Sequence, residues 1–386
     1  MQNELALFSL VFTGDAAHAG DRLRADSAAP ERFAKFVDRH GLRLFLRTAI
    51  EGDDAGAAHL ASALPADWLG ELSAFGARQI ERQRALVREL ARVDGALRGC
   101  GIEPIALKGA YAALRFHGGL ERRAFSDLDL LVQPRQLDTA ERVLSSSGFQ
   151  RRSSILVSRR LTTRFTHAFD FAGHGVLVDL HWRLFPHPSF RADETRPWRI
   201  RRTWTIEGRS YRVLPEDDEV RFGLISVFRD IERGAGRVKH IADLLRMLDA
   251  LDGTVDWAEL LAALRAERML AVAVNVLRLA LDCLPGPERL AGLVAAADAH
   301  RSLLVAGTPE SRRALLESPQ GALANKRWAA QIYESSRLAS LAWWGASLPF
   351  RLAVHHPGKL ARWGRRLRGA AARSGSRRAS AAGSTR

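Results

Sequence analysis

The spacing of apolar residues divides the chain into two helical stretches with a strand-containing stretch between them. From about residue 29 to residue 99, apolar residues recur every three or four positions, the period of a helix with one buried face. The same period returns in three runs, "VRFGLISVFRDIE", "VKHIADLLRMLDALDG" and "VDWAELLAALRAERMLAVAVNVLRLALDCLPG". A less regular helical pattern continues to about Leu348.

Between these stretches the pattern becomes that of short strands. The runs "IEPIALKG" and "DLDLLV" each predict one strand, and two alternating runs on either side of "AGHG" predict a hairpin. A short helix, "AYAALRFHGG", is expected to end at Gly118 and Gly119. Another begins at Pro134 and is capped by Gly148.

These elements predict an α+β fold, with a small mixed-sheet core flanked by N- and C-terminal helical regions. We expect an N-terminal helical region over 1–100, the α/β core over 101–215, a C-terminal helical region over 216–350 and a basic tail over 351–386. The final stretch, "RSGSRRASAAGSTR", has no apolar periodicity, and we expect it to be largely disordered.

The composition of the 386 residues is that of an ordinary globular protein, and its charge is unevenly placed. Residues 351–386 hold ten Lys and Arg and no acidic residue, so they carry ten of the fifteen net positive charges. The rest is only mildly basic, which slightly disfavours a long nucleic-acid substrate. Two distant cysteines, Cys100 and Cys283, argue against a disulfide framework or a zinc site. Glu4 and the short apolar stretch after it do not fit a signal peptide, so we expect a cytoplasmic protein.

Two aspartates open the strand "DLDLLV". On a strand, Asp127 and Asp129 point to the same face, while the leucines beside them face the core. Neighbouring carboxylates repel each other unless a cation lies between them, and Mg²⁺ is commonly held by one or two carboxylates plus substrate phosphates. A simple turn before the strand also fits, since Ser126 and Asp127 are common turn residues.

Two further features bear on this choice. Lys108 and Gly109 stand where a strand passes into a helix, and the free N–H groups of a helix start suit a phosphate. An ordinary turn with a surface lysine fits equally well. Asp179 lies inside the second hairpin strand, where an unpaired buried carboxylate would be costly. A third ligand to the same cation would explain it, and so would an ion pair with Arg183.

The arrangement resembles the polymerase-β-like nucleotidyltransferase superfamily, and in particular a little-characterised bacterial branch with a lysine-glycine motif. The matching motifs are "LKGAYAAL", "RAFSDLDLLV", "LDTAERVLSSSGF" and "VDLHWRL". "DRHGL" and "RVKHIADLLRML" extend the likeness over roughly residues 30–250. The chain departs from the superfamily in lacking its glycine-serine turn and in the long gap from Gly109 to Asp127.

The resemblance implies a metal-dependent transfer of a nucleoside monophosphate from a nucleoside triphosphate, such as ATP, to a hydroxyl acceptor, with release of pyrophosphate. Asp127 and Asp129 would hold two Mg²⁺ ions, or Mn²⁺ in their place. Asp179 would share the ion nearer the acceptor and help to deprotonate its hydroxyl.

The resemblance also implies roles for residues around the carboxylates. The side chain of Lys108 and the amide of Gly109 would bind triphosphate oxygens, and Arg123 would do the same or brace the aspartate pair. Ser126 would orient Asp127. His181 would either contact the substrate or serve the structure alone. Lys239, with Asp243 one helical turn later, would close the site from the C-terminal helices.

Other functions remain open from the sequence. A D-x-D glycosyltransferase would need a larger nucleotide-binding domain before the motif, and in a haloacid-dehalogenase-type phosphatase the D-x-D follows the strand. A non-catalytic role would rest on residues 343–386, where tryptophans and arginines suit contact with anionic lipid or nucleic acid. The acceptor is equally open: a small hydroxylated molecule, a peptide or protein side chain, or an RNA end.

Overall fold

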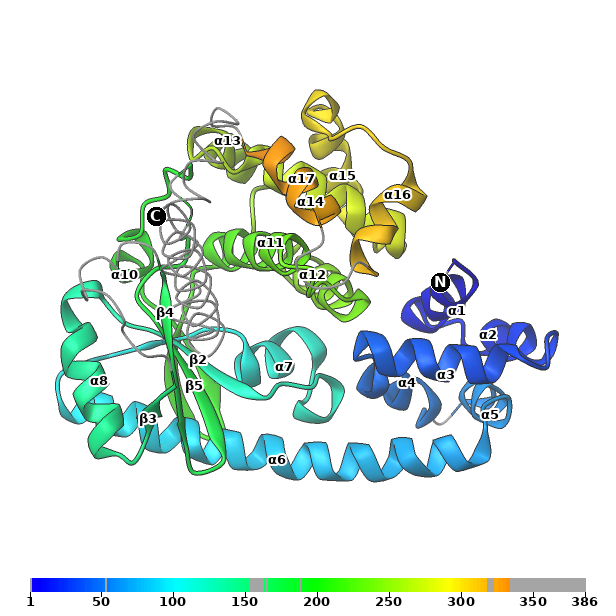
Figure 1. The fold of residues 1–386 in the computed structure, drawn as a ribbon, viewed down its shortest axis with the longest axis horizontal. Helices are drawn as coiled ribbons and strands as arrows, with labels where there is room; N and C mark the ends of the chain where they lie inside the picture. Colours follow the sequence, from blue (N-terminus) through cyan, green and yellow to red (C-terminus); the bar gives the residue numbers. More distant parts are fainter. Residues whose placement is uncertain are drawn as a thin grey trace, which may run out of the picture.

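A computed structural model describes residues 2–52, 54–152, 163, 166–185, 187, 189–317 and 323–333. The described chain has the predicted α+β architecture, with helices before and after a mixed sheet (Figure 1). The predictions for the basic tail, and for lipid or nucleic-acid contact through residues 343–386, lie outside the described residues.

Six helices precede the first strand: α1 (Gln2–Thr13), α2 (Ala16–Arg24), α3 (Ala29–His40), α4 (Arg43–Ile50), α5 (Ala55–Ser62) and α6 (Ala66–Gly99). The end of α6 at Gly99 agrees with the end of the helical periodicity near residue 99, and Pro65 directly precedes the helix. This helix runs along the lower edge of Figure 1, from the small N-terminal helices to the sheet. It therefore joins the N-terminal helices to the sheet.

Seven strands form one mixed sheet in the order β3-β4-β5-β2-β1-β7-β6. Their bounds are β1 (Ile105–Ala106), β2 (Asp127–Leu131), β3 (Gln150–Arg151), β4 (Ala168–Gly173), β5 (Val176–His181), β6 (Arg202–Ile206) and β7 (Arg209–Val213). Strand β2 is antiparallel to β1 and parallel to β5. Helices within this part are α7 (Gly109–His117), α8 (Leu137–Ser146) and α10 (Arg196–Arg199), with 3-10 turns η1 (Leu120–Arg122) and η2 (Pro134–Gln136).

Two hairpins build the outer parts of the sheet. The predicted β4–β5 hairpin turns at His174 and Gly175, whose φ angles of 51° and 74° fit a two-residue turn with positive φ. The sequence analysis missed the β6–β7 hairpin. Its turn at Glu207 and Gly208 has φ angles of 45° and 77°, so the glycine in "TIEGRSY" was the available signal.

The C-terminal helices are α11 (Glu216–Glu232), α12 (Val238–Leu251), α13 (Trp257–Ala266), α14 (Leu270–Cys283), α15 (Ala291–Asp298), α16 (Pro309–Arg313) and α17 (Leu323–Ile332). Three 3-10 turns lie among them, η3 (Glu288–Leu290), η4 (Arg301–Leu303) and η5 (Ala314–Leu316). The long run that begins at Val255 is two helices rather than one continuous helix. The chain breaks at Arg268, whose φ of 60° no right-handed helix accommodates.

A contact between the N-terminal helices and α12 fixes one wall of the site. His40 ends α3 and accepts a hydrogen bond at Nδ1 from the backbone N–H of Val238, at 3.4 Å. Gly41 follows with a φ of 70°, and a Cβ there would lie 3.4 Å from Cδ of Lys239. The segments "DRHGL" and "RVKH", nearly 200 residues apart, therefore lie side by side.

Apolar residues from Leu5 to Tyr333 form one continuous hydrophobic core, which includes Leu128 and Leu130 on the face of β2 away from its aspartates. The alternation of β2 is thus the one predicted. None of the described helices combines the length and apolar character needed to cross a membrane.

Candidate functional site

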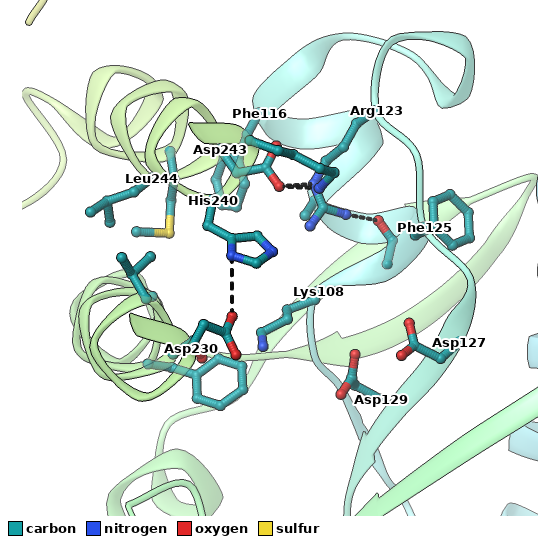
Figure 2. A pocket seen from close by; sticks show the side chains of 18 of the residues that line it. Lys108, Phe116, Arg123, Phe125, Asp127, Asp129, Asp230, His240, Asp243 and Leu244 are labelled. Carbon is teal, nitrogen blue, oxygen red and sulfur yellow. Dashed lines mark hydrogen bonds and ion pairs between the residues drawn. The ribbon is translucent and has the colours of Figure 1, made fainter. Parts of the chain in front are cut away.

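A cavity of about 450 Å³ lies where the sheet, α7, α11 and α12 meet. Figure 2 shows its side chains, with Lys108 between the aspartates of β2 and the helices α11 and α12. All eight residues predicted for the site line this cavity: Lys108, Gly109, Arg123, Ser126, Asp127, Asp129, Asp179 and Lys239. Residues from four separate parts of the sequence are therefore brought to one place.

Strand pairing places the carboxylates. In the parallel pair β2–β5, Asp129 lies directly opposite Asp179, so both side chains point to the same face of the sheet. Asp127 precedes Asp129 by two residues on that face. His181, two residues after Asp179, lies 3.1 Å through Nε2 from Oδ1 of Asp129. Ligand atoms of Asp129, Asp179 and His181 all lie within 4.8 Å of one another.

The surroundings perturb the three carboxylates in different ways. Burial raises the pKa of Asp127, and the neighbouring Asp129 adds to the effect. Burial, with the carboxylates of Asp129 and Asp170, raises the pKa of Asp179 to about 8. Burial also opposes ionisation of Asp129, but the hydrogen bond from His181 and the charge of Lys108 outweigh it, so this pKa is lowered. Asp127 and Asp179 thus have too little positive charge around them to favour their ionised forms.

The donor set fits a divalent cation. Clustered carboxylate oxygens are the ligands that Mg²⁺ prefers, and imidazole nitrogen is accepted more readily by Mn²⁺. A cation at this position would supply the positive charge that Asp127 and Asp179 lack. The tightest cluster nevertheless differs from the predicted one, because it contains His181 in the place of Asp127.

The Lys108–Gly109 turn has the backbone shape of a ligand-binding junction. Both residues have positive φ, 24° and 56°, and α7 begins immediately afterwards. A Cβ on Gly109 would have only ordinary contacts, the nearest being the backbone oxygen of Asp127 at 3.7 Å, so glycine is needed here for its conformation. The ammonium of Lys108 lies 4.8 Å from the ring centre of Phe222 on α11. The turn thus presents the start of a helix and a cation to the cavity.

Arg123 braces this turn from behind. Its Nη1 donates to the carbonyl oxygen of Gly109 at 3.4 Å, and its Nε lies 3.1 Å from Oδ2 of Asp243 (Figure 2). Arg123 itself is held by Gln83 of α6, whose amide donates to its backbone oxygen at 3.1 Å. The structure therefore connects Arg123 to the Lys108–Gly109 turn and to α12, while its charge also acts on Asp127 and Asp129.

Asp243 joins three cationic or titratable groups. Besides Arg123, it pairs with Lys239 at 2.5 Å and with Nε2 of His117 at 3.3 Å. Burial opposes its ionisation, but the charges of Arg123 and Lys239 dominate and hold its pKa far below the usual value. Lys239 is paired inside its own helix and also lines the cavity, so both interpretations of this residue from the sequence describe it.

Ser126 acts on Asp127 through its backbone. The residue is exposed at the cavity, and its main-chain N–H helps to lower the pKa of the Asp127 carboxyl against the effect of burial. Ser126 thus contacts Asp127 through its main-chain amide, and its orienting role remains a prediction.

Several cavity residues were not predicted. Arg229, Arg233 and Arg237 follow one another at four-residue intervals from the end of α11 to the start of α12, and all three line the cavity. His167 also lines it and lies 2.9 Å from Arg229 through Nε2. Glu219 is buried at the cavity, and burial raises its pKa to about 8. The regular arginine spacing in "RDIERGAGR" was the readable signal, whereas nothing in the sequence marks Glu219.

Comparison with known proteins gives one family and a few weak structural likenesses. No curated protein matches the chain. The solution structure of the antibiotic-resistance factor ANT(2″)-Ia is 16% identical, with a TM-score of 0.33, over 48% of this chain and 91% of that one. An antigenic nucleotidyltransferase-like protein from Paracoccidioides brasiliensis is 18% identical, with a TM-score of 0.29, over 55% of this chain and 97% of that one.

A family model described as "uncharacterised nucleotidyltransferase" matches residues 26–285. The match covers more than half of the chain and spans the whole sheet, α7, α11 and α12. It confirms the predicted resemblance to nucleotidyltransferases and identifies the protein as a nucleotidyltransferase rather than a glycosyltransferase. The chain belongs to this nucleotidyltransferase family.

Proposed function

We propose that the protein is a Mg²⁺-dependent enzyme that transfers a nucleoside monophosphate from a nucleoside triphosphate to a hydroxyl acceptor and releases pyrophosphate. The observation that carries the proposal is the in-register pair of Asp129 and Asp179, which faces the same cavity as the Lys108–Gly109 turn. A carboxylate cluster and a phosphate-binding turn in one cavity are the two parts that phosphoryl-group transfer requires.

The carboxylates would hold the metal. Asp127, Asp129 and Asp179 supply oxygen ligands, and His181 either fixes the orientation of Asp129 through its hydrogen bond or joins the ligand set. When bound, the divalent ions neutralise charge on the triphosphate and on the entering and leaving oxygens. Mn²⁺ would serve in the same place because the cluster includes an imidazole nitrogen.

The other residues bind and orient. The N–H groups at the start of α7 and the ammonium of Lys108 would contact the triphosphate, and Arg123 would keep the Gly109 carbonyl and hence the turn in position. Lys239 and the three arginines between α11 and α12 add positive charge to the opposite wall. Asp179, kept ionised by the bound cation, would help to deprotonate the acceptor hydroxyl.

Calorimetry with a nucleoside triphosphate tests the proposal. We expect binding that requires Mg²⁺ and is lost in the double variant Asp127→Asn, Asp129→Asn. A suitable control is Glu71→Gln. Glu71 is an exposed residue of α6, and its Oε2 lies 4.0 Å from Nη2 of Arg43. Binding that is undetectable with Mg²⁺ in the unaltered protein, or equal in the double variant, would show that the site is wrongly assigned.

A further inference from the structure

One wall of the cavity is largely apolar and belongs to three helices. On α11, Glu219, Phe222, Gly223 and Ser226 are spaced three or four residues apart, so they share one face of the helix, and all four line the cavity. The facing apolar residues are Ala112 and Phe116 of α7 and Leu244 and Met247 of α12. In Figure 2, Lys108 separates Phe116 and Leu244 from Asp127 and Asp129.

The shape of this wall depends on a glycine. A Cβ on Gly223 would lie 2.6 Å from Cε of Met247, so the absence of a side chain lets the methionine pack directly against α11. The surface is then made of aromatic rings and a thioether, groups that pack well against a planar ring. A nucleobase has this shape, whereas a polyhydroxylated acceptor would leave its hydroxyl groups without partners there.

Glu219 is the polar exception in this wall. Its side chain is buried, with the residue only 4% exposed, and Oε1 has no hydrogen-bond partner among the described residues. Arg115 and Lys108 act on it electrostatically without a hydrogen bond to it in the described chain. Because an unsatisfied buried carboxyl oxygen is costly, the site is complete only when a ligand donates to it.

The phosphate turn leads directly to this wall. The ammonium of Lys108 lies 4.8 Å from the ring centre of Phe222, one helical turn from Glu219. Ala112, which lines the same cavity as Glu219, lies one turn after Gly109 on α7. A nucleotide whose phosphates occupy the Lys108–Gly109 turn can therefore extend its base along α7 toward Glu219.

We propose that this wall binds the nucleobase and that Glu219 accepts a hydrogen bond from its exocyclic amino group. The inference rests on the proposed function and adds to it the class of nucleotide. Adenine, guanine and cytosine carry an exocyclic amino group, and uracil does not. The enzyme therefore selects against uridine triphosphate, because uracil has a carbonyl oxygen where cytosine has its amino group and cannot donate from that position to the buried oxygen of Glu219.

The test compares four nucleotides that cannot be turned over. Binding of the α,β-methylene analogues of ATP, GTP, CTP and UTP is measured by calorimetry with Mg²⁺. We expect at least one amino-bearing analogue to bind about tenfold or more tightly than the UTP analogue, the worth of one hydrogen bond to a buried carboxyl group. In Glu219→Met, which keeps the length and removes the acceptor, that preference disappears. In Glu219→Gln, which keeps a carbonyl acceptor, much of it remains.

The thermal midpoint separates this role from a purely structural one. Replacing an unpaired buried carboxyl by methionine should leave the thermal midpoint unchanged or raise it. If Glu219→Met is as stable as the unaltered protein and no longer prefers the amino-bearing analogues, the loss is an effect on binding. Equal binding of all four analogues by the unaltered protein, or an unchanged preference in Glu219→Met, overturns the inference and leaves the proposed function intact. If no analogue binds, the proposed function itself fails.

Discussion

Asp243 of α12 accepts a hydrogen bond from Nε of Arg123 at 3.1 Å, although the two residues are 120 positions apart. Arg123 in turn donates to the carbonyl oxygen of Gly109. Arg123 therefore links α12 to the Lys108–Gly109 turn. Figure 2 shows this link as two consecutive dashed contacts.

Replacement of Asp243 should destabilise the protein and loosen the turn. In Asp243→Asn the charges of Arg123 and Lys239 lose their common anion, and breaking a buried ion pair costs about 3–5 kcal/mol. We expect a clear drop in the thermal midpoint and weaker nucleotide binding. Glu71→Gln, which replaces an exposed carboxylate of α6, is the control and should change the stability by about 0.5 kcal/mol or less. An Asp243→Asn variant as stable as the unaltered protein would contradict the assigned link.

His181 should control metal-dependent binding through Asp129. The contact of 3.1 Å orients a carboxylate of the metal cluster, and loss of such a supporting contact typically weakens metal affinity by about 10–100-fold. We expect His181→Ala to weaken Mg²⁺-dependent nucleotide binding to this extent. His181→Gln can still donate to Asp129 and should recover part of the affinity. Calorimetric titrations at several Mg²⁺ concentrations measure the nucleotide affinity of the unaltered protein and of the two variants. Equal affinity in all three proteins would rule out a role of His181 in metal-dependent binding.

The backbone of Gly109 should matter more for binding than for folding. At a φ of 56°, alanine is strained by about 1–2 kcal/mol, although its Cβ has room. Gly175→Ala is a matched control, because Gly175 has a φ of 74° and open space in the distant β4–β5 turn. Both variants should show a similar loss of thermal stability, while only Gly109→Ala weakens triphosphate binding. Equal binding by the two variants would contradict a phosphate site at the turn.

Stability should fall in mild acid because of His40. Burial, with the charges of Arg39 and Arg237, lowers the pKa of this histidine to about 4, from 6.5 in the unfolded chain. Between these values the unfolded chain binds a proton that the folded protein does not, so stability is complete above pH 6.5 and falls toward pH 4. The loss amounts to at most about 3 kcal/mol.

Thermal unfolding at pH 7 and pH 5 measures this effect. His40→Gln, which cannot be protonated, should show a smaller difference between the two pH values than the unaltered protein does. The exposed His18 provides the control, and His18→Gln should retain the full difference. An unchanged pH difference in His40→Gln would show that another group is responsible, and His117, whose pKa burial also lowers to about 4, would be examined next.

The local parts of the fold were predictable because they depend on neighbouring residues. The period of two in "DLDLLV" placed Asp127 and Asp129 on one face, and the end of the helical period near residue 99 marked the end of α6. The missed β6–β7 hairpin and the break at Arg268 show the limit of this approach. The break depends on the positive φ of Arg268, which the sequence pattern does not reveal, while the hairpin turn at Glu207 and Gly208 was marked only by its glycine.

The sequence by itself determined which groups could do chemistry: a carboxylate pair, a third carboxylate on another strand and a lysine-glycine turn. It could not determine how they meet, because β2 pairs with β5 across about 50 intervening residues and the register decides whether Asp129 faces Asp179. Only the tertiary structure brought α12 to Arg123 and placed Glu219 against an apolar wall. Burial and long-range contact are properties of the packed chain, so they first appear when the helices close over the sheet.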